Sequence, residues 1–154
     1  MTDSDLALDK QVCFALYAAS RAVTQLYRPV LDALGLTYPQ YLVMLVLWEC
    51  GPSTVKHLGH ELDLDSGTLS PLLKRLEATG YVRRERSATD ERSVVVHLTE
   101  AGAALRTRAS SVPREIAGAT GMEFVELSAL RQNLVRLTEA VSARQLTPNE
   151  GDPS

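Results

Sequence analysis

The sequence predicts a mainly α-helical fold with one small β-hairpin, and three observations lead to this expectation. Apolar residues recur every three or four positions over residues 5–34, which is the spacing of one face of a helix. Two short helical segments follow one another within residues 53–79, joined by a tight polar connection. Two strand-like stretches, 81–86 and 94–98, then enclose a polar segment rich in turn-forming residues.

Length and composition limit the class of protein. The 154 residues make one ordinary domain, and 45% of them are hydrophobic, which is enough for a core. Charged residues interrupt every hydrophobic segment, and the acidic N-terminus lacks the pattern of a signal peptide. We therefore expect a cytoplasmic chain that has no membrane partner.

Residue types that support metal, cofactor or enzyme chemistry are few. The chain has two cysteines and three histidines, and neither Cys-x-x-Cys nor His-Glu-x-x-His occurs. A Gly-rich phosphate loop and a Gly-x-Ser-x-Gly motif are also absent from the sequence. We expect no metal, no cofactor and no enzymatic activity. The net charge of −3 argues against general affinity for nucleic acids, unless positive charge is concentrated locally.

The first two helices are predicted from spacing and capping. A helix over residues 5–34 would be about 45 Å long, and Pro29 loosens it near its end because the proline nitrogen donates no hydrogen bond. Thr37 and Gln40 have the spacing of a capping box. The helix that this box opens, over 41–49, is almost entirely apolar, so we expect it to be buried.

A helix-turn-helix pattern occupies the middle of the chain. Ser53 is the expected N-cap of a short helix that ends near Leu62, and Asp65 is the expected N-cap of the next helix. That next helix, over 66–79, carries leucines on one face and ends at Gly80. Strands that bear arginines follow directly, so these residues together predict a winged helix-turn-helix.

Long helices flank this winged core. Thr99 caps a helix over 100–111 that ends or kinks at Pro113, and a last amphipathic helix runs over about 123–144. The outer helices extend past anything that the winged core covers, so their apolar faces need a second copy of the chain, and we expect a homodimer. Within a single domain, the helical dimerisation region is expected at 1–36 and 112–146, the winged DNA-binding region at 37–111 and a flexible tail at 147–154.

Positive charge gathers on the segment that is predicted to meet DNA. Residues 66–97 hold six Lys and Arg against four Asp and Glu, a sum of +2 in a chain of net charge −3. Small hydroxyl residues at the start of the recognition helix let the backbone approach a duplex, and basic residues hold its phosphates. Arg92, near the wing tip, is the candidate for insertion into a minor groove, and Asp90 would orient it through a bidentate pair. The expected contacts to double-stranded DNA are Ser66, Thr68, Ser70, Lys74, Arg75, Arg84, Arg86, Asp90 and Arg92.

Each of these features also has a purely structural interpretation. Hydroxyl residues at a helix start serve ordinary capping, and an Asp90–Arg92 bridge would stiffen a hairpin without touching DNA. A single cysteine on an apolar helix, such as Cys13, is most often a small buried hydrophobic residue. Tyr27 and Tyr38 would then be core aromatics.

Several runs of residues are typical of one family. They are 12–17 (VCFALY), 26–28 (LYR), 36–45 (LTYPQYLVML), 48–49 (WE), 64–76 (LDSGTLSPLLKRL) and 90–92 (DER). Over roughly residues 10–140 the chain resembles the MarR family of winged-helix repressors and, within it, the organic-hydroperoxide-sensing branch called OhrR. The resemblance implies that Cys13 is the peroxide-reactive thiol, that Tyr27 and Tyr38 hydrogen-bond it, and that Tyr17 lies beside the site.

Geometry adds a condition to this implied site. Tyr27 follows Cys13 by fourteen residues, about 21 Å along a straight helix, so contact requires the partner's first helix. A peroxide is attacked by thiolate, which two phenolic donors would stabilise. In a helix that begins near Asp5, Cys13 is past the first turn and gains little from the helix dipole. Oxidation would displace the tyrosines and change the spacing of the two recognition helices, so that a pseudo-palindromic operator is released.

The fate of the oxidised thiol and the inducer are left open by the residues. Some relatives carry a resolving cysteine before the last helix, but residues 116–121 have none. The chain is therefore similar to the one-cysteine type, in which a small external thiol forms a mixed disulfide or overoxidation occurs; Cys50 is a less favoured partner. Apolar neighbours such as Phe14 favour an organic hydroperoxide. The alternatives are a MarR-type repressor that responds to a small aromatic ligand, a cysteine peroxidase, and a helical module that does not meet DNA.

Overall fold

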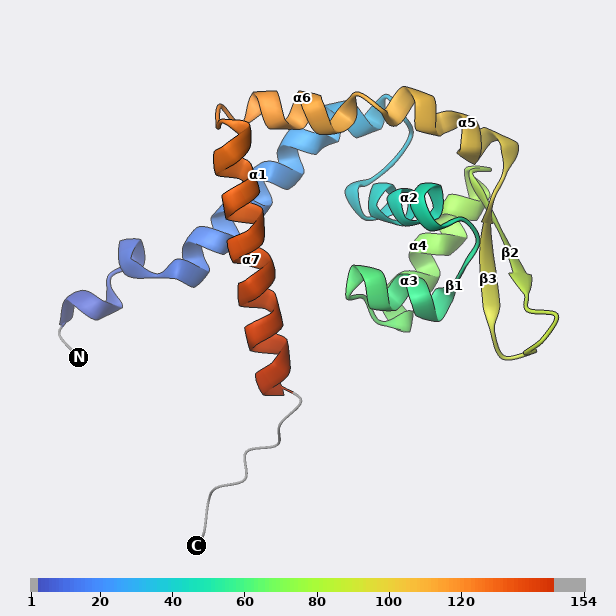
Figure 1. Ribbon diagram of the computed structural model, residues 1–154, viewed down its shortest axis with the longest axis horizontal. Helices are drawn as coiled ribbons and strands as arrows, with labels where there is room; N and C mark the ends of the chain where they lie inside the picture. Colours follow the sequence, from blue (N-terminus) through green and yellow to red (C-terminus); the bar gives the residue numbers. More distant parts are fainter. Residues whose placement is uncertain (1–2, 146–154) are drawn as a thin grey trace, which may run out of the picture. The chain divides into compact units, whose positions relative to one another are not determined.

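The computed structural model describes residues 3–145, and the tail expected over 147–154 lies outside the described residues (Figure 1). The chain divides into two compact units, Met1–Val112 and Pro113–Ser154. The first unit holds the winged helix-turn-helix. The elements in chain order are the 3-10 helices η1 (Asp3–Leu6) and η2 (Leu8–Lys10), then α1 (Val12–Asp32), α2 (Tyr38–Cys50), β1 (Ser53–Thr54), α3 (Val55–Leu62), α4 (Ser66–Ala78), β2 (Val82–Arg86), β3 (Val94–Leu98), α5 (Glu100–Ala109), α6 (Val112–Ala119) and α7 (Phe124–Gln145).

Helix α1 begins at Val12, so the prediction of a helix from residue 5 is wrong. Ala7 and Gln11 are both extended, with ψ of 136° and 110°, and this separates the two 3-10 turns from α1. The side chain of Gln11 donates to the carbonyls of Asp5 and Ala7, at 2.7 and 3.1 Å. These bonds satisfy carbonyls that a continuous helix would have used for its own amides. As a result, Cys13 lies in the first turn of α1.

The capping box that was predicted before α2 is confirmed. The backbone N–H of Thr37 donates to Oε1 of Gln40 at 2.9 Å, and the N–H of Gln40 donates to Oγ1 of Thr37 at 3.4 Å. Helix α2 begins at Tyr38, three residues earlier than expected, since Pro39 is tolerated in a first turn. Its apolar side chains, Val43 and Met44 among them, are fully buried. This helix forms the centre of the core of the first unit.

The helix-turn-helix consists of α3 and α4. The N-cap of α3 is Thr54, whose Oγ1 accepts the N–H of His57 at 3.0 Å; the expectation that Ser53 caps this helix is wrong. Asp65 caps α4 as predicted, with its Oδ1 accepting the N–H of Thr68 at 2.7 Å. Leucines of both helices are completely buried: Leu58, Leu69, Leu73 and Leu76. They hold the recognition helix α4 firmly on the core.

The wing belongs to a three-stranded antiparallel sheet in the order β1-β3-β2. The hairpin of β2 and β3 was predicted, and Arg84 pairs with Val96 at its centre. Strand β1 was missed because two residues, Ser53 and Thr54, carry no periodicity. Figure 1 shows the hairpin extending away from α3 and α4 to its tip. Val96 is fully buried, so the base of the wing packs on the core while the tip is exposed.

Helix α5 closes the first unit. Its N-cap, Thr99, was predicted and accepts the N–H of Gly102 at 3.1 Å. A Cβ at Gly102 would lie 2.0 Å from the carbonyl oxygen of Tyr81, so only glycine allows α5 to approach the wing this closely. Trp48 fixes α5 to α2 through a hydrogen bond of 2.9 Å from Nε1 to the carbonyl of Gly102. The helix ends at Ala109, two residues before the predicted end.

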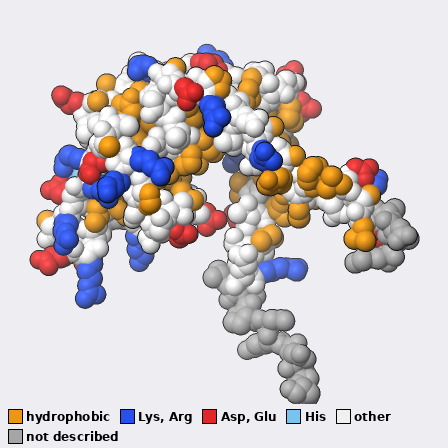
Figure 2. Space-filling view, turned by 180° about the vertical axis from the view of Figure 1, so that it is seen from behind, with side chains coloured by type: hydrophobic (Ala, Val, Ile, Leu, Met, Phe, Trp, Pro, Cys, Tyr) orange, Lys and Arg blue, Asp and Glu red, His pale blue; other side chains and the backbone are white. Residues whose placement is uncertain are grey.

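Apolar side chains remain exposed on α1 and, in the second unit, on α7. Val12 is 68% exposed and Tyr17 is 60% exposed, and Figure 2 shows hydrophobic side chains along the part of α1 that leads to the N-terminus. No residue of α7 is buried. The exposed apolar residues of α7 include Phe124, Val125, Leu130, Val135, Leu137 and Val141. None of the described helices is long and apolar enough to cross a membrane.

Candidate DNA-binding surface and redox site

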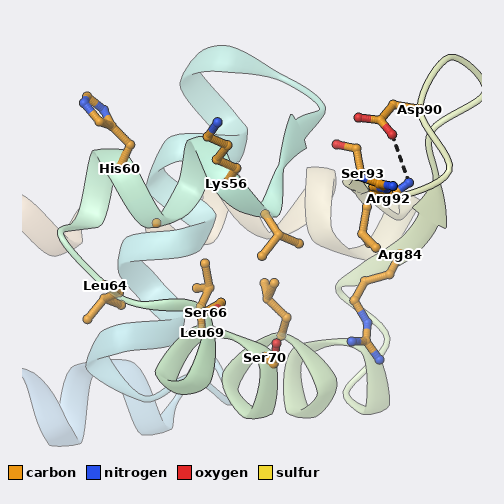
Figure 3. Close-up of a pocket in the computed structure, with 14 residues that line it drawn as sticks. Lys56, His60, Leu64, Ser66, Leu69, Ser70, Arg84, Asp90, Arg92 and Ser93 are labelled. Atoms are coloured by element: carbon orange, nitrogen blue, oxygen red, sulfur yellow. Dashed lines mark hydrogen bonds between the residues drawn. The ribbon is translucent and has the colours of Figure 1, made fainter.

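A groove of about 670 Å³ lies between α3, α4 and the wing (Figure 3). Its floor is apolar, and its rim carries cations from α3 and from the wing and hydroxyl groups from α4. The polar lining residues are Lys56 and His60 on α3, Ser66 and Ser70 on α4, and Arg84, Asp90, Arg92 and Ser93 on the wing. Figure 2 shows Lys and Arg side chains projecting from the part of the molecule that carries the wing. Cations on both sides of a groove are suited to hold the phosphates of a DNA strand.

The start of α4 is exposed and preorganised. Ser66, Thr68 and Ser70 are all exposed, and the first buried side chain of the helix is Leu69. The Asp65 carboxylate accepts backbone hydrogen bonds from this turn, mainly from Thr68, and they hold its pKa below the usual range. The hydroxyls of Ser66 and Ser70 are therefore accessible to a base edge or a phosphate, whereas the Thr68 side chain also hydrogen-bonds the Asp65 carboxylate and helps the cap to hold the turn in place. Lys74 and Arg75, further along α4, are exposed as well.

At the wing tip, Asp90 and Arg92 interact differently from the expectation. Oδ1 of Asp90 accepts the backbone N–H of Arg92 at 3.0 Å (Figure 3). No ion pair joins the two side chains in the part of the chain that the structure describes, so the expected bidentate pair is replaced by a turn-forming bond. The guanidinium of Arg92 is exposed, and Arg86 is exposed at the end of β2. Contact of these two arginines with DNA remains a prediction.

Arg84, expected to contact a phosphate, is instead paired within the chain. Its Nη2 lies 3.2 Å from Oε1 of Glu77, and its backbone N–H donates to Oε2 of the same carboxylate at 2.9 Å. These two bonds hold the pKa of Glu77 below its usual range, the backbone bond contributing most. Glu77 lies on α4 and Arg84 on β2, so the pair connects the recognition helix to the wing.

The two cysteines are both exposed. Cys13 is the second residue of α1, and Cys50 is the last residue of α2. The N-cap residue Gln11 makes no capping bond with its side chain, so the first amides of α1 have no side-chain acceptor from the cap. Tyr17, one turn after Cys13, packs against Arg21, whose guanidinium carbon lies 5.5 Å from the ring centroid.

The structure brings Tyr27 and Tyr38 together, as the resemblance implied, but on the same chain they are remote from Cys13. Their ring centroids are 4.8 Å apart. Tyr27 lies fourteen residues after Cys13 on one continuous helix, a separation of about 21 Å. Burial, then the neighbouring Tyr38 and Tyr41, raises the pKa of Tyr27 to about 12. Both phenols therefore stay protonated and able to donate at neutral pH.

Sequence reasoning missed three residues of these sites. Tyr41 packs its ring 5.9 Å from that of Tyr27, and only its apolar context in α2 was noticed. Lys56 and His60 lie one turn apart on α3 and face the groove. Their i, i+4 spacing on the helix before the recognition helix was the available signal. Tyr41 therefore adds a third ring to the tyrosine cluster, and Lys56 and His60 add α3 to the elements that line the groove.

The winged fold and its cation-rimmed groove define a winged-helix DNA-binding protein. A family model described as transcriptional regulator SarA/Rot matches residues 25–107. Two relatives are the HTH-type transcriptional regulator TtmR of Methylorubrum extorquens (strain PA1), 49% identical over 92% of this chain and 73% of that protein, and the organic hydroperoxide resistance transcriptional regulator of Bacillus subtilis (strain 168), 48% identical over 88% and 92%. The chain therefore belongs to the MarR/SarA family of winged-helix transcriptional regulators, and it is not an enzyme. The predicted family and fold class are confirmed.

Solved structures with the same fold are bound to DNA. Reduced AbfR bound to DNA is 37% identical, with a TM-score of 0.78 over 93% of this chain and 98% of that chain. A mutant MarR from E. coli complexed with operator DNA is 25% identical, with a TM-score of 0.72 over 80% and 90%. AbfR has also been solved in overoxidised and in disulfide forms, with TM-scores of 0.74 and 0.60. DNA binding by this chain is supported by these relatives.

Proposed function

We propose that this protein is a cytoplasmic, homodimeric repressor that senses organic hydroperoxides through Cys13 and then releases a pseudo-palindromic operator. One observation carries the proposal: an exposed thiol lies in the first turn of α1, and two half-buried tyrosines that contact each other, Tyr27 and Tyr38, lie further along the same chain. Thiol and phenols are the parts of one site, and the length of α1 separates them within a chain. A second copy whose α1 runs antiparallel supplies the missing half.

The position of Cys13 suits a nucleophilic thiolate. At the second residue of α1 the sulfur is at the positive end of the helix dipole, next to amides that have no intrahelical acceptor. Negative charge is favoured at such a place. This helix start adds to the stabilisation by the phenols, whereas a helix beginning near residue 5 would have left the phenols to act alone.

The chemical step requires only the thiolate and the peroxide. The sulfur attacks one oxygen, the S–O bond forms as the O–O bond breaks, and the alkoxide takes a proton and leaves as an alcohol. Cys13 is thereby oxidised to a sulfenic acid and the hydroperoxide is reduced. A small external thiol then forms a mixed disulfide and releases water, because a second cysteine is absent from residues 116–121.

Exposed apolar surface supports the dimer and the choice of peroxide. Val12, Phe14 and Val23 on α1 are exposed, and so are the apolar residues of α7. Surfaces of this kind on two helices are typical of a subunit interface. Phe14 and Val12 flank Cys13 and would favour an alkyl group over a hydrated peroxide. The B. subtilis relative is described as an organic hydroperoxide resistance regulator, and AbfR has been crystallised in several oxidation states.

One observation favours an alternative, a repressor that responds to a small aromatic ligand. A cavity of about 190 Å³ is lined by Tyr27, Arg28 and Tyr38, among others. Two phenol rings and a guanidinium would suit a small aromatic carboxylate. In that case Cys13 would be incidental.

The test is a titration of DNA from just upstream of the gene, by fluorescence anisotropy at fixed salt concentration, because affinity depends on salt. Wild type, Cys13→Ser and the matched control Cys50→Ser are compared with and without cumene hydroperoxide. We expect wild type and Cys50→Ser to release DNA, and Cys13→Ser to stay bound. A Cys13→Ser protein that releases DNA with peroxide would overturn the proposal. Release of DNA by benzoate in wild type and in Cys13→Ser would support the alternative.

A further inference from the structure

The end of α1 is attached to the winged core by two hydrogen bonds to consecutive carbonyls. Nη2 of Arg108 donates to the carbonyl of Ala33 at 2.7 Å, and the hydroxyl of Tyr81 donates to the carbonyl of Leu34 at 2.8 Å. The turn that follows α1 uses other acceptors, since the amides of Leu34 and Leu36 both bond Leu31. The last carbonyls of a helix lack an amide partner, so side chains from elsewhere satisfy them.

Tyr81 lies at the junction between the recognition helix and the wing. It follows Gly80, whose φ of +84° ends α4, and directly precedes β2 of the wing. Its N–H donates to the carbonyl of Leu76 at 3.3 Å, and its carbonyl accepts the N–H of Thr99 at 3.1 Å. Close packing against Gly102 leaves this backbone no room to shift relative to α5. The Tyr81 backbone therefore moves with the recognition helix and the wing as one body.

Leu34, at the other end of the bond, moves with the tyrosines of the redox site. It lies between Tyr27 on α1 and Tyr38, the first residue of α2. The Leu34 side chain is 5% exposed, and the connection from α1 to α2 spans only residues 33–37. A displacement of the Tyr27–Tyr38 pair therefore reaches this carbonyl through a short, packed segment.

We propose that Tyr81 is a positioning residue that couples the state of Cys13 to the orientation of the wing and recognition helix. This inference rests on the proposed function. When the oxidised sulfur displaces Tyr27 and Tyr38, the Leu34 carbonyl moves with them, and its hydrogen bond transmits this movement to Tyr81 at the junction between α4 and β2. The wing and the recognition helix then leave the orientation that fits DNA. Arg108 acts in parallel on the neighbouring carbonyl, from an exposed position on α5.

The test uses Tyr81→Phe, which keeps the ring and removes the hydroxyl. The matched control is Thr138→Val, which likewise removes a single hydroxyl that donates to a backbone carbonyl, that of Leu134 within α7, and involves no residue of the link. The DNA dissociation constants of the reduced and the cumene-hydroperoxide-oxidised proteins are measured, together with the rate of Cys13 oxidation. In Tyr81→Phe the ratio of oxidised to reduced dissociation constants should fall by about three- to tenfold, the weight of one hydrogen bond. The reduced affinity and the oxidation rate should stay within about twofold.

The outcomes separate this inference from the proposed function. A wild-type protein that keeps DNA after oxidation overturns both, whereas a wild type and a Tyr81→Phe that release DNA equally overturn only the coupling. Equal loss of affinity in both redox states of Tyr81→Phe would also overturn it, since that is the effect of a merely structural bond. If Tyr81→Phe does not fold, Arg108→Gln is measured in its place. A smaller reduction of the same ratio is then expected, and an unchanged ratio counts against the coupling.

Discussion

Cys13 owes its place at a helix start to the polar residue just before α1. Gln11 turns its side chain back to the carbonyls of Asp5 and Ala7, and its own extended backbone breaks the helical path. The thiol therefore lies at the positive end of the helix dipole, and Tyr27 lies about 21 Å further along the same helix. Within one chain the thiol and the phenol are therefore too far apart to touch, and this is why we propose that the two parts of the site come from different chains.

Tyr27 should ionise at an unusually high pH. Burial raises its pKa from 10.0 to about 12, because the phenolate loses hydration and lies near Tyr38 and Tyr41. A raised pKa means that the folded protein holds the proton longer than the unfolded chain does. Stability from this group is therefore complete below about pH 10 and is lost as the pH rises to about 12.

An ultraviolet titration of phenolate absorbance measures this. Tyr27→Phe should remove the ionisation step with the highest midpoint, and the control Tyr17→Phe should leave that step in place. If the highest step persists in Tyr27→Phe, the buried environment that we describe for this phenol is incorrect.

At the scale of elements, a single carboxylate fixes the wing to the recognition helix. Glu77 of α4 accepts both the backbone N–H and the guanidinium of Arg84 on β2. The side chain of Arg84 is 31% exposed and its Nε is buried without a partner among the described residues. Arg92, at the wing tip, has an exposed guanidinium. Two arginines of one hairpin therefore lie in different environments: Arg84 is paired within the chain, and Arg92 is exposed and predicted to contact DNA.

The salt dependence of DNA binding should distinguish these roles. Arg92→Gln removes a charge that faces phosphate or minor groove, so the slope of log affinity against log salt should fall by about one. Arg84→Gln should weaken binding with little change of slope, because its charge is already neutralised by Glu77. Glu77→Gln combined with Arg84→Gln should cost less affinity than the sum of the single changes. If Arg84→Gln also lowers the slope by about one, this arginine contacts a phosphate after all.

At the scale of the whole molecule, each unit exposes apolar helix surface that a lone chain leaves uncovered. In the first unit this surface includes Val12 and Tyr17 of α1, and in the second it extends along α7. The division into dimerisation and DNA-binding regions that the sequence suggests remains a prediction. In the function that we propose, a second copy of the chain covers these faces and completes the redox site.

Mixed dimers test the shared site directly. Cys13→Ser and Tyr27→Phe are inactive in different halves of the site, so each homodimer should respond poorly to peroxide. A dimer formed from one chain of each kind has one intact site, Cys13 from one subunit facing Tyr27 of the other. Differently tagged chains, refolded together and purified as mixed dimers, should regain about half of the oxidation rate of wild type, one site of two. If oxidation in the mixed dimers stays at the level of the homodimers, the site is not shared in this way.

Much of the fold followed from local signals. The Thr37–Gln40 box, the Asp65 and Thr99 caps and the strand over 94–98 depend on neighbouring residues alone, and each is found where it was expected. Strand β1 and the cap of α3 were missed or misplaced. The pairing of Ser53 with Val96 is decided by a strand more than forty residues away.

The sequence by itself determined the family and the winged helix-turn-helix, because motifs and periodicities are local properties of a chain. Only the tertiary structure decided what those side chains contact. It pairs Arg84 with Glu77, gives Asp90 a backbone partner, and joins Tyr81 to Leu34 across 47 residues. Such partners depend on how distant elements pack, and this packing is set by contacts throughout the core that no single segment of the sequence specifies.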